Sequence, residues 1–170
     1  MASAFELLGV PVTFNLNESD INAALRSVGL QWHPDRFACA SAAEREHAEE
    51  QMAEFNVAHA TLCDPLRRAI ALLDVFSCPY DHNGVNADPE FLMDMLEIKE
   101  QLHDAKQNND STVLNKLIFD LRKREQHELE QLARLFTAWE TANNRSQDLP
   151  QLQQLLNQLH YLDRTIETSF

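Results

Sequence analysis

The chain has 170 residues, of which 44% are hydrophobic and 24% charged, and it contains only 3 glycines and 6 prolines. This length and apolar content suffice for one domain or two small ones, and the scarcity of helix-breaking residues predicts an all-α protein. The formal net charge of −13 excludes nucleic acid and anionic membrane surfaces as expected partners, because both prefer basic protein faces.

The cysteines and the first residues indicate the compartment. The chain has three cysteines, Cys39, Cys63 and Cys78, with no CxxC pair, and such a sparse, odd set is not a disulfide framework. The opening residues Met-Ala-Ser-Ala-Phe-Glu include no basic region and no apolar run long enough for a signal peptide or a membrane span. The sequence therefore predicts a cytoplasmic protein.

Residues 1–76 are predicted to form four helices in the order short, long, long, short. The first helix ends at Gly9, and the second begins after Asn17 as its N-cap. Ser41 and Glu44 form the capping-box pattern of a third helix, and Asp64 followed by proline starts a fourth. The expected core positions are Ile21, Ala24, Leu25, Val28 and Trp32 in the second helix, Ala48, Met52, Phe55, His59 and Leu62 in the third, and Leu66, Ala69, Ile70, Leu73 and Val75 or Phe76 in the fourth.

A loop with the sequence Trp-His-Pro-Asp-Arg-Phe, residues 32–37, joins the two long helices. Pro34 cannot continue a helix and drives His33 into an extended conformation, so the second helix is predicted to end at about Trp32. His33 and Asp35 are then presented on an accessible loop. The apolar stripes on either side predict that the two long helices pack as an antiparallel pair.

This helix order around a His-Pro-Asp loop resembles the J domain of DnaJ-like co-chaperones. The resemblance implies a DnaK-type chaperone as partner, whose ATP hydrolysis the loop and the basic face of the preceding helix stimulate. The implied chaperone-binding residues are His33, Pro34 and Asp35, with Arg26 and Arg36 as the nearby basic residues. J domains usually carry several lysines or arginines before the loop, whereas that helix has only Arg26 here; this departure predicts weaker docking or the use of other groups.

Residues 77–87, which contain Pro79 and Asn83-Gly84, are predicted to be a linker. Residues 88–170 are predicted to form a bundle of three helices. The first follows the Asp88-Pro89 start signal, the second ends at Asn143, and breaks at residues 143–144 and at Pro150 precede the third. The expected core positions are Phe91, Met95, Ile98, Leu102 and Ala105, then Val113, Leu114, Leu117, Ile118, Leu121, Leu129, Leu132, Leu135, Phe136 and Trp139, and finally Leu152, Leu155, Leu156, Leu159, Leu162 and Ile166.

Three apolar residues of the first bundle helix do not belong to its core stripe. Leu92, Met93 and Leu96 lie roughly 100–160° from the centre of that stripe. They form either a second buried contact or an exposed apolar patch, and the acidic residues on the same side favour an exposed surface. In the last helix, Tyr161 is expected to point nearly opposite to the core stripe. The acidic residues beside the patch are Glu97, Glu100 and Asp104.

The whole chain resembles the HscB (Hsc20) family, the J-type co-chaperones of iron–sulfur cluster assembly. The residues that carry this resemblance are 32–37, Asp64-Pro65-Leu66, and Phe91-Leu92-Met93 through Leu96-Glu97. It implies two partners, the specialised DnaK-type chaperone HscA and the cluster scaffold protein IscU, and neither a resident metal nor a cofactor. The implied scaffold-binding residues are Leu92, Met93, Leu96, Glu97, Glu100, Asp104 and Tyr161.

Other functions find less support in the sequence. A nucleophilic enzyme built on His33, Asp35 and Cys39 lacks a glycine-rich loop or an oxyanion motif, so the chain is not expected to be an enzyme. His59 and Cys63, one helical turn apart, are expected to be core residues rather than metal ligands. A helical adaptor with an idle loop and a general J-type holdase for unfolded proteins stay open as alternatives.

Overall fold

The structure is a computed structural model that describes residues 2–80, 88–142 and 145–169. The described residues form seven α-helices and one 3₁₀ helix and no strand, as expected for an all-α protein. The chain divides into two compact units, Met1–Pro79 and Tyr80–Phe170. Most of the linker predicted at 77–87 lies outside the described residues.

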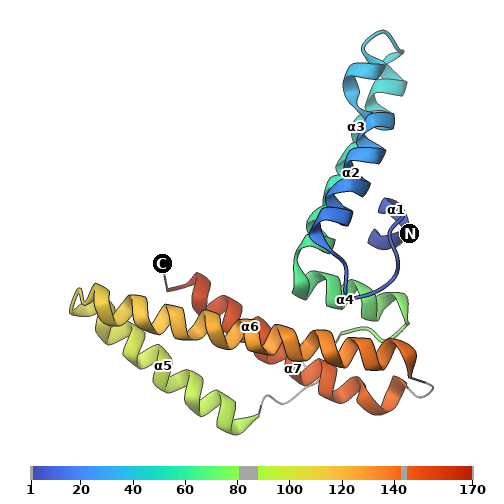
Figure 1. Cartoon of the computed structure of the whole chain (residues 1–170). Coiled ribbons are helices and arrows are strands. Elements are labelled where there is room, and N and C mark those ends of the chain that lie inside the picture. The colour runs from blue at the N-terminus through green and yellow to red at the C-terminus, as the bar shows by residue number, and fades with distance from the viewer. Residues whose placement is uncertain (1, 81–87, 143–144, 170) are drawn as a thin grey trace. The chain divides into compact units, whose positions relative to one another are not determined.

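The first unit has the predicted order of a short helix, two long helices and a short helix. The long helices α2 and α3 run antiparallel, and the loop joins them at one end of the hairpin (Figure 1). The short helix α1 packs on both long helices, and α4 packs on α3. The bounds are α1 Ala4–Leu8, α2 Glu18–Trp32, η1 Pro34–Phe37, α3 Ala42–Cys63 and α4 Pro65–Val75.

Local signals in the sequence define the ends of these helices. The Ser41 hydroxyl accepts a hydrogen bond from the backbone N–H of Glu44, whose carboxylate accepts one from the backbone of Ser41, so the predicted capping box is formed. The Ser41 hydroxyl also donates to the Glu44 carboxylate at 2.7 Å, and this bond, followed by the one from the Ser41 backbone N–H, lowers the pKa of Glu44. Gly9 ends α1 with φ 65°, a left-handed conformation that glycine adopts without strain. Asn17 precedes α2 as predicted, but its side chain contacts the carboxylate of Asp20 instead of capping the helix.

The core of the first unit includes one residue that the sequence pattern does not reveal. Arg68 on α4 is only 9% exposed, although a charged residue is rarely buried without partners. Its guanidinium donates to the backbone carbonyls of Leu62 (2.6 Å), Phe14 (2.9 Å) and Leu16 (3.4 Å). Arg68 therefore joins the start of α4 to the end of α3 and to the segment before α2. The buried hydrophobic residues are Phe5, Leu8, Phe14, Ile21, Ala48, Phe55, Ala58, Leu62, Ala69, Leu72 and Leu73.

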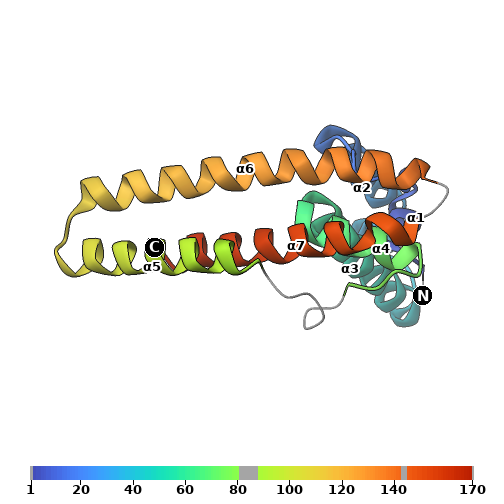
Figure 2. The same cartoon turned by 90° about the horizontal axis from the view of Figure 1, so that it is seen from below.

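The second unit consists of α5 Pro89–Gln107, α6 Ser111–Thr141 and α7 Arg145–Glu167. The longest helix, α6, runs antiparallel to both α5 and α7 (Figure 2). All six core positions predicted for α7 are buried, and so are four of the five predicted for α5, Ile98 being half-buried. Of the ten core positions predicted for α6, five are buried, whereas Val113 is exposed and that part of the prediction is wrong. Phe91, Met95 and Leu102 of α5 pack in one cluster with buried residues of α6 and α7.

The expected chain break at Pro150 is wrong, because α7 begins at Arg145 and continues through this proline. Two hydrogen bonds fix the earlier start. The indole N–H of Trp139 donates to the carbonyl of Arg145, and the guanidinium of Arg145 donates to the carbonyl of Glu140, both at 2.9 Å. Tertiary contacts with the end of α6 thus hold a turn of helix that the proline alone disfavours.

No helix within the described ranges combines the length and the apolar character needed to cross a membrane.

Candidate functional sites

The His-Pro-Asp loop has the backbone conformation predicted from its proline. Helix α2 ends at Trp32, and His33 is extended, with φ −61° and ψ 131°. Pro34 then occupies the first position of the 3₁₀ helix η1, where its missing N–H is not needed. The loop is therefore a short ordered turn between two helix ends.

The side chains of His33 and Asp35 are coupled within this turn. Nδ1 of His33 accepts a hydrogen bond from the backbone N–H of Asp35 at 3.3 Å and lies 3.5 Å from the Asp35 carboxylate. In the neutral imidazole this bond places the proton on Nε2, and in the protonated form Nδ1 faces the carboxylate. The two side chains are 57% and 90% exposed, so a partner can reach both.

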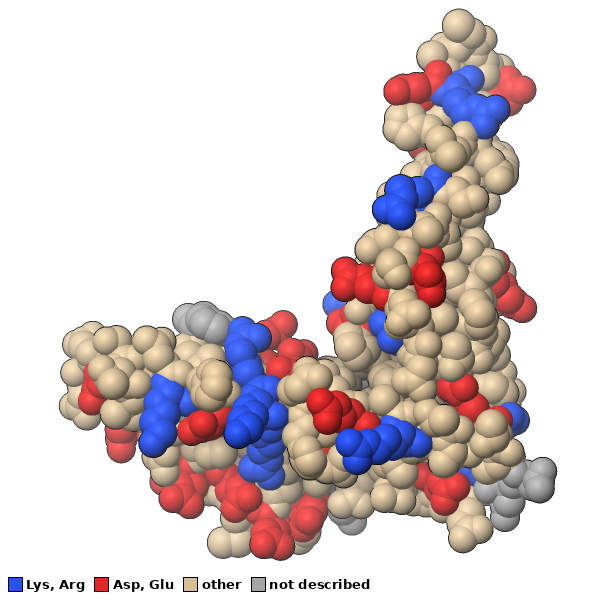
Figure 3. Space-filling view, viewed as in Figure 1, with Lys and Arg blue, Asp and Glu red and all other residues tan. Residues whose placement is uncertain are grey.

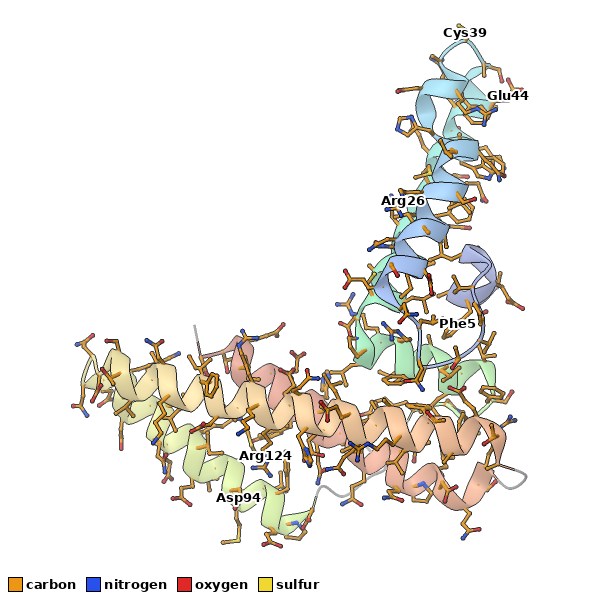
Figure 4. The ribbon with its side chains drawn as sticks, viewed as in Figure 1. Phe5, Arg26, Cys39, Glu44, Asp94 and Arg124 are labelled. Atoms are coloured by element: carbon orange, nitrogen blue, oxygen red, sulfur yellow. The ribbon has the colours of Figure 1, made fainter. Side chains whose placement is uncertain are left out.

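The two arginines proposed beside the loop differ in position. Arg36 Nη1 donates to the carbonyl of Leu30 at 2.6 Å, so its guanidinium satisfies one of the last carbonyls of α2. Its positive charge also interacts favourably with the negative end of the α2 helix dipole. Its remaining N–H groups stay available to a partner. Arg26 is exposed on α2, seven residues before His33 (Figure 4). The loop thus gathers His33, Asp35 and Arg36, and Arg26 lies roughly 10 Å back along the helix.

An aromatic cluster that the sequence analysis did not assign supports the loop. The rings of Trp32 and Phe37 stack at 6.1 Å between centroids with an interplanar angle of 12°. His47 on α3 meets Trp32 edge-on at 5.5 Å. Trp32 is thereby tied to α3, and Phe37 is held against Trp32. The sequence signal for this cluster was the pair of aromatic residues that flank His-Pro-Asp-Arg.

The second candidate site is a surface of α5. Leu92, Met93 and Leu96 are 41%, 74% and 59% exposed, so they form an exposed apolar patch and not the second buried contact. Glu97, Glu100 and Asp104 are exposed on the same helix. Acidic side chains gather along α5 in the space-filling view (Figure 3). We call these six residues the α5 surface.

Tyr161 does not point away from the core as expected. It is half-buried, and its ring meets the ring of Phe91 edge-on at 6.0 Å. The Lys99 ammonium donates to the phenol oxygen at 2.9 Å and lies 4.2 Å from the ring centroid. The correction arises because α7 contacts α5 as well as α6, so a second side of α7 is covered. Tyr161 therefore packs against the core and contacts α5 through Phe91, the residue that precedes Leu92 of the α5 surface.

A row of contacts continues from Tyr161 to α6. The guanidinium of Arg124 lies 5.1 Å from the Phe91 ring, and it also pairs with the carboxylate of Asp94 at 3.7 Å (Figure 4). Lys99 therefore contacts the ring of Tyr161, and Arg124 contacts the ring of Phe91. Nothing in the sequence indicated these contacts, because Lys99 and Arg124 have the pattern of ordinary surface residues.

His59 and Cys63 form a packing contact between helices. The His59 Nε2 atom bonds to the amide oxygen of Asn22 on α2 at 2.7 Å, and the Cys63 sulfur lies 3.4 Å from the same nitrogen. Burial raises the pKa of the Cys63 thiol, which opposes a nucleophilic role. Nowhere in the described part of the chain do three His, Cys, Asp or Glu side chains gather in a way that could hold a metal ion.

Comparisons with known proteins match each of the two units to a known domain family. Residues 3–71 match the family model of the DnaJ domain, and residues 87–168 match that of the HSCB C-terminal oligomerisation domain. A co-chaperone HscB homolog from Burkholderia multivorans is 37% identical over 134 residues, covering 78% of this chain and 77% of the relative. One from Cupriavidus taiwanensis is 40% identical over 126 residues, covering 72% of each.

Solved structures show the same fold over nearly the whole chain. Chaperone HscB from Vibrio cholerae aligns with a TM-score of 0.79 at 28% identity, covering 99% of this chain and 95% of that one. Human co-chaperone HscB aligns with a TM-score of 0.83 over 99% of this chain and 81% of its own, and at 19% identity it supports the fold alone. With a J domain, an HscB-type C-terminal bundle and curated relatives of this similarity, the chain belongs to the HscB family of J-type co-chaperones.

Proposed function

We propose that this protein stimulates the ATPase of a DnaK-type chaperone of the HscA kind and delivers an IscU-type iron–sulfur scaffold protein to it, in the cytoplasm. The observation that carries the proposal is the pairing of two accessible surfaces on one chain. The first unit offers the His-Pro-Asp loop, with His33 and Asp35 exposed. The second offers the α5 surface, an apolar patch with an acidic border.

The loop acts through a conformational equilibrium of the chaperone, which carries out the ATP hydrolysis. A ligand that binds one state of its partner more tightly shifts the partner towards that state. Asp35 supplies a carboxylate and His33 an imidazole on a turn whose backbone is fixed by Pro34 and η1. Arg36 and Arg26 supply positive charge beside them, which favours an acidic docking face on the chaperone.

The α5 surface holds the scaffold. A few buried apolar side chains usually supply most of the affinity of such a contact, and a charged border gives specificity. Leu92, Met93 and Leu96 are the apolar anchors, with Tyr161 at the edge. Tethering the scaffold to the chain that also docks on the chaperone raises the scaffold's effective concentration there. The description of the matching family adds a further role to this unit, contact between copies.

The test is steady-state ATP hydrolysis by the HscA-type chaperone with the scaffold present. We expect this protein to raise the rate and the His33→Gln variant to leave it at the rate of the chaperone and scaffold alone. His127→Gln, the same change at an exposed position on α6, is the control and should behave as the unmodified protein. Equal stimulation by the His33→Gln variant would instead support the helical adaptor.

A general holdase makes a different prediction. It would suppress aggregation of many denatured proteins, and replacing Leu92 or Leu96 would affect all of them alike. The proposed function requires instead that these residues matter for binding of the scaffold. Light scattering measures the aggregation of two unrelated denatured proteins in the presence of this protein, and suppression of both that depends on Leu92 or Leu96 would support the holdase.

A further inference from the structure

Two exposed hydrophobic side chains of the second unit have no cover. Met93 on α5 is 74% exposed and Phe119 on α6 is 67% exposed, the largest values among the large hydrophobic residues described in this unit. Met93 belongs to the α5 surface, whereas the proposed function gives Phe119 no role. Met93 is part of a contiguous apolar patch, the kind of surface that marks interaction sites in soluble proteins, whereas Phe119 needs a further observation to be assigned a role.

Both side chains lie between two charges of one sign, at identical spacing. Met93 has Glu90 three residues before it and Glu97 four residues after it. Phe119 has Lys116 and Lys123 at these same positions. All four charged residues are exposed. The two stretches are therefore complementary, apolar to apolar and acidic to basic.

The basic character of the α6 stretch contrasts with the rest of the chain. Residues 116–124 contain four cations, Lys116, Arg122, Lys123 and Arg124, and one acid, Asp120, within a protein of net charge −13. In the space-filling view, lysine and arginine side chains gather over α6 while acidic ones line α5 (Figure 3). The α6 stretch is thus suited to an acidic partner surface with an exposed apolar side chain.

Helix geometry determines how two such stretches meet. At 3.6 residues per turn, positions three before and four after a residue lie one turn to either side of it, and both are displaced to the same side of the helix. Two helices with this pattern match side for side only when they run antiparallel. That alignment places Met93 on Phe119, Glu97 on Lys116 and Glu90 on Lys123. It also forms a thioether–aromatic contact, which is favourable.

The two stretches do not meet within one chain. Helices α5 and α6 of one molecule contact each other through other faces, as the pair between Asp94 and Arg124 shows. Met93 and Phe119 remain exposed beside this contact. We propose that residues 90–97 on α5 of one copy dock antiparallel on residues 116–123 on α6 of a second copy.

The contact joins different surfaces of the two copies, so it is head-to-tail and leaves one complementary stretch open on each molecule. Two turns of helix on each side bury less than the roughly 1,200 Å² of stable interfaces, so the association is weak and depends on concentration. Met93 and Glu97 also belong to the α5 surface. This one step rests on the proposed function: because the scaffold binds the α5 surface there, a second copy and the scaffold compete for Met93 and Glu97 and exclude each other.

Charge reversal tests the contact by sedimentation velocity. The protein is measured from about 10 μM to about 1 mM at about 0.15 M ionic strength, where long-range repulsion between acidic molecules is largely screened. We expect the sedimentation coefficient of the unmodified protein to rise with concentration. The double variant Lys116→Glu/Lys123→Glu should stay at the monomer value, and so should Glu90→Lys/Glu97→Lys. An equimolar mixture of the two variants should associate again, because each restores the charges that the other lacks.

Other variants separate the contact from net charge and from folding. Arg45→Glu/Arg134→Glu changes the net charge as much as the lysine variant does but lies outside both stretches, and it should associate as the unmodified protein does. Phe119→Ser removes only an exposed side chain and should weaken association at least tenfold without changing the circular dichroism spectrum. A monomer at every concentration, or a variant mixture that stays monomeric, would overturn the proposal.

The competition is measured separately, by adding the scaffold to the self-associated protein. We expect the self-associated species to be replaced by a complex of one copy with the scaffold. A scaffold that binds while the association persists would overturn mutual exclusion. If the scaffold fails to bind at all, the proposed function fails, but the result with the protein alone still decides the contact between copies.

Discussion

Glu125 on α6 is a half-buried carboxylate whose surroundings disfavour its ionised form. Burial raises its pKa, the negative charge of Asp163 on α7 raises it further, and Arg122 opposes the rise. A raised pKa means that the folded state binds the proton more tightly than the unfolded state. The ionised carboxylate therefore lowers stability above the raised folded pKa, and this effect disappears below the unfolded pKa.

Glu125→Gln should consequently stabilise the second unit at neutral pH. The amide has nearly the shape of the protonated acid and removes both the buried charge and the repulsion from Asp163. Thermal unfolding should show a higher Tm for the variant at pH 7 and equal values near pH 3. A variant less stable than the unmodified protein at pH 7 would show that the contact with Arg122 outweighs the burial.

Among single residues, the sequence indicated the exposed loop correctly and the orientation of Tyr161 wrongly. His33 and Asp35 lie on an exposed turn because Pro34 dictates the local backbone, which is a property of three consecutive residues. The position of Tyr161 depends on which helix lies against α7. The contacts with Phe91 and Lys99 come from another part of the chain, so periodicity within one helix could not show them.

At the scale of elements, Arg68 on α4 links α4 to the end of α3 and to the segment before α2. Its guanidinium satisfies the carbonyl of Leu62 in the last turn of α3 and those of Phe14 and Leu16 before α2. Burial lowers the pKa of this arginine, but guanidinium is too basic to lose its charge. Three segments that are distant in sequence thus share one buried cation.

Arg68→Met should destabilise the first unit by about 3 kcal/mol, because it leaves buried carbonyls without donors. The matched control is Arg67→Met, which removes an exposed neighbour paired only at the surface with Asp64 and should cost less than about 1 kcal/mol. Urea unfolding followed by circular dichroism gives both values. Equal losses for the two variants would mean that the carbonyls of Phe14 and Leu16 find water instead.

The whole molecule separates its two proposed tasks between its two units. The His-Pro-Asp loop lies in Met1–Pro79 and the α5 surface in Tyr80–Phe170. On the proposed function, the chain itself is the tether that links the two tasks. Changes on one unit should therefore leave the task of the other intact.

Leu92→Ser/Leu96→Ser should reveal this separation. Both side chains are exposed, so the fold should be retained. We expect the variant to stimulate the chaperone as well as the unmodified protein when the scaffold is absent, and to lose most of the additional stimulation when it is present. Steady-state ATPase rates measured with and without scaffold check this, and a variant defective in both conditions would contradict it.

The all-α fold and most helix ends could be predicted from the sequence, which also favoured, without deciding, the exposure of Leu92, Met93 and Leu96. These features follow from local chemistry, from caps and prolines that fix helix ends, and from a periodicity that separates apolar faces within one helix. The burial of Arg68, the start of α7 before Pro150 and the contacts of Tyr161 could not be predicted in this way. Each depends on which distant backbone or side chain lies opposite, and that is set by the packing of helices against one another.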